Sequence, residues 1–192
     1  PKGDSFANAI TLDDFDTAMT GAGHGANWVK SGNVHTLIDW RIYIVGSDTY
    51  VHFYNACIQF TGTMVANLFM YLSSGAHFKV GTDDMGSTEQ KGGCAFLFGS
   101  TNSSITCAFS GVHAEIYDSM FTDVLSRNRV NFRYGGISED ESVLIDRCLF
   151  IKTQYLSHVS LGGYSARYVR LRDLIVKESQ YGIDFSAGIN YL

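Results

Sequence analysis

Proline is almost absent from this chain of 192 residues, because Pro1 is the only one. Proline lacks the backbone N–H that a β-ladder uses, so nothing in the body of the chain interrupts a strand in this way. The richest apolar stretch, residues 65–72, is broken by Asn67 and falls short of the roughly 18 residues that a membrane-spanning helix needs. The sequence therefore predicts long hydrogen-bonded ladders and no membrane span.

Positive charge is also scarce. Charged residues make up 17% of the chain, and its 14 Lys and Arg residues face 19 Asp and Glu residues, which gives a net charge of −5. A protein that binds duplex nucleic acid needs a basic surface to meet the phosphates. We therefore expect no nucleic-acid partner.

No cysteine pair has the spacing of a metal site, and the chain contains no H-E-x-x-H and no Gly-x-Ser-x-Gly motif. We therefore expect no metal and no cofactor. Each of the four cysteines lies in an apolar, strand-like run, which indicates a small buried side chain. The alternative is a disulfide between neighbouring repeats or subunits, which an oxidising exterior permits. The disulfide candidates are Cys57, Cys94, Cys107 and Cys148.

A short pattern recurs in the second half of the chain. Residues 144–151 are followed, 26 positions later, by residues 170–177 with the same order of apolar and polar side chains. A further copy lies 29 positions before the first. Repeats at this period are typical of solenoids, in which equivalent apolar residues point inward and stack. The equivalent inward positions are Ile116, Ile145 and Leu171, and Phe121, Phe150 and Val176.

Strand-like runs begin at residue 34 and follow one another at spacings too short for helices between them, which excludes an alternating βαβ fold. A parallel β-helix, or β-solenoid, and an antiparallel β-sandwich remain. The chain contains no Asn-Gly or Asp-Gly hairpin turn, which favours the solenoid. Polar residues expected at corners are Asp39, Asn55, Asp118, Asp146 and Asp173. The predicted strands include residues 36–45, 50–60, 64–72, 77–80, 94–98, 105–109 and 112–117.

Residues 1–30 differ from the rest, because they are acidic and only weakly periodic. We interpret them as an N-terminal cap, a short helix or irregular segment that covers the first repeat, with the β-solenoid domain in residues 31–192. Residues 181–192 bring no polar capping segment of their own. We therefore expect a neighbouring subunit to cover that end.

The repeats resemble those of the right-handed parallel β-helix (pectate-lyase-like) superfamily, in which an Ile-x-x-Cys/Asn-x-Phe strand is followed by a Gly-Ile strand. Residues 144–150 and 181–185 match this pattern, and the resemblance covers about residues 34–188. The resemblance implies a parallel β-helix fold. It also suggests a polysaccharide lyase or glycoside hydrolase, whose carboxylate pair would be Asp83 and Asp84 and whose basic residue would be Arg129.

The chain departs from the motif order of such enzymes, in which the Asp pair is followed by Gly-His-Gly and then by Arg-x-Lys. Here Gly23-His24-Gly25 precedes the Asp pair, and the Arg-x-Lys motif is lacking. Calcium is expected only if the chain is a lyase. Clustered arginines could instead form a ladder that binds an anionic glycan or an acidic subunit. A solvated face balanced by nearby acidic residues is the favoured interpretation. These candidates are Arg127, Arg129, Arg133, Arg170 and Arg172.

We interpret the chain as a structural subunit of an extracellular assembly, such as a surface layer, a sheath or a viral fibre. Its expected partner is a second copy of itself, in a homo-oligomer or polymer joined through solenoid ends or sides. The alternative is a carbohydrate-binding or polysaccharide-cleaving module with a glycan as partner. Both interpretations place the protein outside the cell or on a cell or virion surface.

Overall fold

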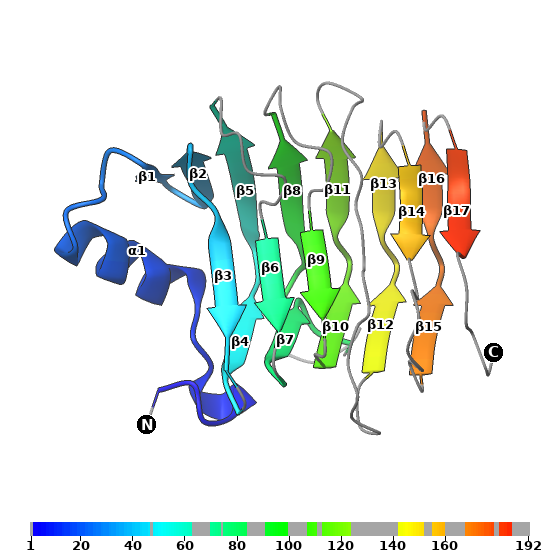
Figure 1. Cartoon of the computed structure of the whole chain (residues 1–192), viewed down its shortest axis with the longest axis horizontal. Coiled ribbons are helices and arrows are strands. Elements are labelled where there is room, and N and C mark those ends of the chain that lie inside the picture. The colour runs from blue at the N-terminus through cyan, green and yellow to red at the C-terminus, as the bar shows by residue number, and fades with distance from the viewer. Residues whose placement is uncertain are drawn as a thin grey trace.

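The computed structural model shows an all-β chain with a short helical segment at its N-terminal end (Figure 1). It describes residues 2–46, 48–62, 70–73, 75–83, 91–99, 107–110, 113–123, 142–151, 155–159, 168–178 and 181–185. The helices are η1 (Phe6–Asn8) and α1 (Leu12–Gly21). The strands are β1 (Trp28–Ser31), β2 (Val34–Ile38), β3 (Ile42–Val45), β4 (Tyr50–Phe53), β5 (Ala56–Thr61), β6 (Met70–Ser73), β7 (His77–Val80), β8 (Cys94–Phe98), β9 (Cys107–Ser110), β10 (His113–Tyr117), β11 (Met120–Asp123), β12 (Ser142–Asp146), β13 (Leu149–Ile151), β14 (Tyr155–Val159), β15 (Tyr168–Arg172), β16 (Ile175–Lys177) and β17 (Tyr181–Phe185).

Helix α1 begins where the sequence offers a capping box. The Thr11 backbone N–H and the Thr11 hydroxyl both donate to Asp14 Oδ2 at 2.7 Å. Leu12 is buried, and Phe15 and Met19 pack against the core from the same helix. The boundary that we drew between residues 30 and 31 lies within β1, so the division into two segments stays a prediction.

The strands form four sheets, and nearly all of the pairing is parallel. Only β1 and β2 pair in the antiparallel sense in the described part of the chain. From β3 to β11 the chain visits three sheets in rotation, one strand at a time, and then begins again. Sheet A has the order β15-β12-β10-β7-β4, sheet B β1-β2-β5-β8-β11-β13-β16, sheet C β3-β6-β9 and sheet D β14-β17.

The predicted repeat is confirmed in its register. Ile145 of β12 lies beside Ile116 on one side and Leu171 on the other, with all three strands parallel. In sheet B, Phe150 likewise lies between Phe121 and Val176. The antiparallel pairing of these segments that a β-sandwich requires is therefore not found among these strands.

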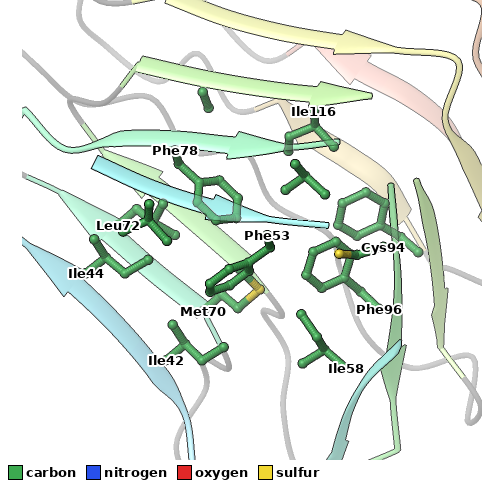
Figure 2. Close-up of a cluster of buried hydrophobic side chains, with 14 of the residues drawn as sticks. Ile42, Ile44, Phe53, Ile58, Met70, Leu72, Phe78, Cys94, Phe96 and Ile116 are labelled. Carbon is green, nitrogen blue, oxygen red and sulfur yellow. The ribbon is translucent and has the colours of Figure 1, made fainter. Parts of the chain in front are cut away.

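Stacked rings form the centre of the core. Phe96, Phe121 and Phe150 lie in register on β8, β11 and β13, with centroids 4.8 and 5.0 Å apart and nearly parallel planes. Each ring is at most 1% exposed. The separation matches the spacing of neighbouring strands, about 4.8 Å, so backbone pairing and ring stacking support each other. Figure 2 shows Phe96 among the side chains of Phe53, Phe78 and other core residues.

Left-handed residues form the corners between strands. Asp39 separates β2 from β3 and Asn55 separates β4 from β5, with φ of 52° and 51°. The continuous strands predicted for residues 36–45 and 50–60 are therefore wrong, because one residue in the left-handed region turns the chain. The corner after β12 also differs from expectation. Arg147, with φ of 51°, takes the left-handed conformation, and Asp146 is the buried last residue of the strand.

The last residue in each of the two predicted inward rows is only partly covered. Val176 is 37% exposed and Leu171 is partly buried, whereas Phe150 beside Val176 is 1% exposed. The register is the predicted one, but β16 is the outermost strand of sheet B among the described residues. Predicted strand positions 64–69, 105–106 and 112 lie outside the described part.

We predict that Phe150→Ala lowers the free energy of unfolding by about 3–5 kcal/mol, because the cavity removes contacts with the ring of Phe121. Urea unfolding followed by circular dichroism measures this change. The control is Val45→Ala, where a side chain that is 58% exposed is removed and the change should stay within about 0.5 kcal/mol. A similar small loss for Phe150→Ala would contradict the stacked core.

Candidate functional site

A group of charged side chains lies at the corner between sheets A and B, where β10 leads to β11 and β12 leads to β13. Arg147 binds Asp118 through two bonds, from Nε to Oδ1 at 2.7 Å and from Nη2 to Oδ2 at 3.0 Å. The guanidinium also lies 5.5 Å from the centre of the Tyr117 ring. This bidentate pair ties two successive corners together.

Asp146 lies beneath Arg147 and is fully buried. Its Oδ2 accepts hydrogen bonds from Arg147 and from Arg172, while its Oδ1 has no partner in the structure. The hydrogen bond from Arg172 is the main cause that holds the pKa of Asp146 below its ordinary value, and the charge of Arg147 acts in the same direction. A buried carboxylate with two guanidinium partners stays ionised. Asp146 therefore serves to hold Arg147 and Arg172 in place.

Asp83 extends the group toward solvent. Its Oδ1 lies 3.4 Å from both Arg147 Nη1 and Arg172 Nη2, and its side chain is 60% exposed. The structure thus brings together Asp83, which we suggested as a catalytic carboxylate, and Arg172, which we suggested as a glycan-binding residue. The exposed Arg170 lies on the same strand as Arg172. The other predicted site residues lie outside the described part of the chain: Asp84, Arg127, Arg129 and Arg133.

The corner group braces neighbouring strands. The Asp83 carboxylate lies beside the guanidinium groups of Arg147 and Arg172, whose own pKa values are raised mainly by their hydrogen bonds to Asp118 and Asp146. Arg147 was not among the predicted site residues. Its one sequence signal is an arginine directly after a corner aspartate.

A second acidic group lies between α1 and the first strands. Ligand atoms of Asp13, Asp16 and His35 lie within 4.8 Å of one another, which satisfies the distance requirement of a metal site. However, Lys30 Nζ forms ion pairs with Asp13 and with Asp16, and His35 Nδ1 lies 3.0 Å from Asp16 Oδ1. The single ammonium group offsets one of the two carboxylate charges, and these contacts join the helix to β1 and β2.

The cysteines in the described part behave as buried apolar residues. Cys94 and Cys148 are 3% and 1% exposed, and burial raises the pKa of each thiol to about 12. Both are free thiols, as is the partly buried Cys57. The side chain of Cys107 lies outside the described residues, and a disulfide with another subunit stays a prediction.

The two ends of the stack of strands differ, as Figure 1 shows with α1 at one end and β16 and β17 at the other. At the first end, residues 3–10 hydrogen-bond to the edge of β4: Ile10 N–H donates to Tyr50 O at 2.9 Å, and Tyr50 N–H donates to Gly3 O at 2.9 Å. Strand β1 covers the edge of β2. Edges of sheets A and B are therefore protected there.

At the opposite end, β15 and β16 are the outermost described strands of sheets A and B. Ile175 is 54% exposed and Val176 is 37% exposed, although both follow a strand whose Phe150 is buried. Exposed apolar side chains therefore lie on the outermost described strand of sheet B, at a surface that we call the β16 edge. Such an edge is a site where another strand can add.

No protein-family model matches this chain, and neither the curated proteins nor the solved structures include a significant match. Among the described residues, no helix has the length and apolar character needed to cross a membrane. The site must therefore be interpreted from its own geometry.

We predict that Arg147→Met lowers the free energy of unfolding by about 1–3 kcal/mol, because Asp118 loses its bidentate partner and buried Asp146 loses one of two donors. Arg170→Met, on the exposed face of β15, is the matched control and should change stability little. Equal losses of unfolding free energy for the two variants, measured by chemical denaturation, would contradict the bracing role of Arg147.

A further prediction concerns the pH dependence of stability. The pKa of Asp146 is below its ordinary value of 3.8, so the stability that its ionised form contributes is present above that value and is lost as the pH falls through the lower pKa of the folded state. The stability gap between the native protein and Asp146→Asn should therefore narrow below about pH 4. A constant gap between about pH 7 and pH 3, measured by urea unfolding, would contradict the assignment.

Proposed function

We propose that the chain forms a parallel β-solenoid, with each turn contributing one strand to each of three faces. The rotation of the chain through sheets A, B and C, followed by sheets A, B and D, supports this fold. Parallel register at equivalent positions, such as Ile116, Ile145 and Leu171, supports it as well. The pectate-lyase-like relationship remains part of the proposal.

The proposed function is that of a structural module that self-associates through the β16 edge. The observation that carries it is the exposure of Ile175 and Val176 at the end of a sheet whose preceding strand is buried. Burying these side chains removes apolar surface from water, and strand pairing between two copies would add backbone hydrogen bonds to this contact.

The occupant of this edge is a second copy of the chain in a two-fold arrangement. Residues 3–10, β1 and α1 occupy the opposite end, so the β16 edge of one copy cannot readily pair in the same way with that end of another. Two β16 edges are identical and can meet in an isologous contact, which closes after two subunits. A closed dimer is thus favoured over a fibre.

A structural role also agrees with the chemistry of the corner. Asp83, the described member of the suggested carboxylate pair, is engaged by Arg147 and Arg172. The proposed setting is the exterior of a cell or virion, where the closed dimer would be one building unit of a surface layer, a sheath or a fibre.

The following prediction tests this association. Analytical ultracentrifugation of residues 1–192, in reductant and over a range of micromolar concentrations, should detect a dimer. Val176→Lys should raise its dissociation constant at least about tenfold, because a charge is placed at the centre of the contact. Val45→Lys is the control, since Val45 is exposed on β3, the first described strand of sheet C, and its substitution should leave the dimer intact.

Circular dichroism would establish that each variant retains its strands. A monomeric native chain at the highest concentration would overturn self-association. Long polymers formed in reductant would overturn the closed two-fold contact, and equal weakening by both lysine variants would show that the β16 edge is not the interface.

A further inference from the structure

A cavity of about 770 Å³ lies beside the N-terminal helix, away from the corner charges and the β16 edge. Its walls come from α1, from β1 and from the segment that joins β2 to β3 and continues into β3. This volume is within the usual range for small-molecule sites, about 300–1,000 Å³. The lining residues are Phe15, Met19, Trp28, Asp39, Trp40, Arg41, Ile42 and Tyr43.

Aromatic rings dominate the cavity, and both tryptophans of the chain line it. Trp28 is buried and stacks on Phe15, with centroids 5.8 Å apart and planes 11° apart, so it forms a fixed wall. Trp40 is partly buried and contacts the His24 ring at 4.8 Å. A partly exposed indole held in this way offers a flat apolar surface to a ligand.

Two charged groups accompany the rings. Arg41 lies 4.7 Å from the centre of the Tyr43 ring, and this cation–π contact places the guanidinium beside the cavity. Asp39 is held by its left-handed backbone and by a 3.0 Å hydrogen bond from its N–H to Thr61 O. Gly62 accommodates its carboxylate, because a Cβ at that position would lie 2.3 Å from Asp39 Oδ1.

The chemistry of the lining selects among ligands. A purely apolar ligand would displace water from the exposed Asp39 and Arg41 side chains without offering them hydrogen bonds, which is costly. An anionic ligand would meet the carboxylate of Asp39, and a cationic one would meet Arg41. A neutral ligand that combines an apolar face with several hydroxyl groups suits both the rings and the two opposite charges.

We propose that this cavity binds a neutral pyranose, either a free sugar or one ring of a glycan. The C–H face of the sugar packs on Trp40, its hydroxyl groups accept hydrogen bonds from Arg41, and they donate to Asp39. Tyr43 is a positioning residue, since it holds the guanidinium. The site is independent of the proposed dimer, because no lining residue belongs to the β16 edge.

The test uses saturation-transfer-difference NMR on residues 1–192 with a panel of neutral methyl pyranosides: glucoside, galactoside, mannoside and N-acetylglucosaminide. At least one should give a signal from its C–H face, and the same sugar should change the intrinsic fluorescence, because both tryptophans line the cavity. Galacturonate and the apolar dye ANS are the comparison ligands.

Arg41→Gln and Tyr43→Ala should each weaken binding of that sugar about five- to tenfold. The first removes the guanidinium that donates to the sugar hydroxyl groups, and the second removes the ring that holds this guanidinium in place. Tyr43 is 46% exposed, so its substitution is compatible with folding even where Trp40→Ala is not. Val45→Ala, on the same strand but outside the lining, is the matched control. Absence of binding by every neutral pyranoside would overturn the proposal. Preferential binding of galacturonate or ANS, or affinity unchanged in both variants, would overturn it as well.

Discussion

The structure depends on the parallel, in-register pairing of each strand with its equivalent in the next repeat. This pairing places the rings of Phe96, Phe121 and Phe150 at the separation of the strands themselves. Hydrogen bonding and apolar packing therefore cannot be optimised separately, because a shift of register would disrupt both. It also means that every interior repeat has two neighbours, whereas a terminal repeat has only one and must be covered by something else.

The repeat could be recognised from the sequence because its apolar residues recur with one phase. Ile116, Ile145 and Leu171 are spaced by the lengths of whole repeats, and their pairing follows that spacing. The polar residues at Asp39 and Asn55 were expected at corners, and both take the left-handed backbone conformation of a corner. The repeat spacing alone did not show that each of them ends one strand and begins another, because a run of β-branched and aromatic residues looks the same whether it forms one strand or two.

The corner charges show a second limit of sequence analysis. Asp83 is far from Arg147 and Arg172 along the chain, and the separation depends on connections of unequal length between repeats. Apolar residues can be aligned by type, but an ion pair forms only where two side chains point toward the same volume. The aromatic cavity has the same character. Trp28 begins β1, whereas Trp40 lies between β2 and β3. Helix α1 encloses the space between them only after the chain has folded.

One column of residues shows how the chain changes from apolar packing to charge toward the β16 edge. Tyr117, Asp146 and Arg172 occupy equivalent positions on three successive strands of sheet A. A buried ion pair adds little net stability, because desolvation offsets much of the attraction, but it penalises wrong arrangements strongly. A slip of β12 by one residue would turn Asp146 to the opposite face of the sheet and away from both arginines. We infer that the contacts of Asp146 with Arg147 and Arg172 act mainly to fix the register, next to the end where fewer apolar neighbours remain to fix it.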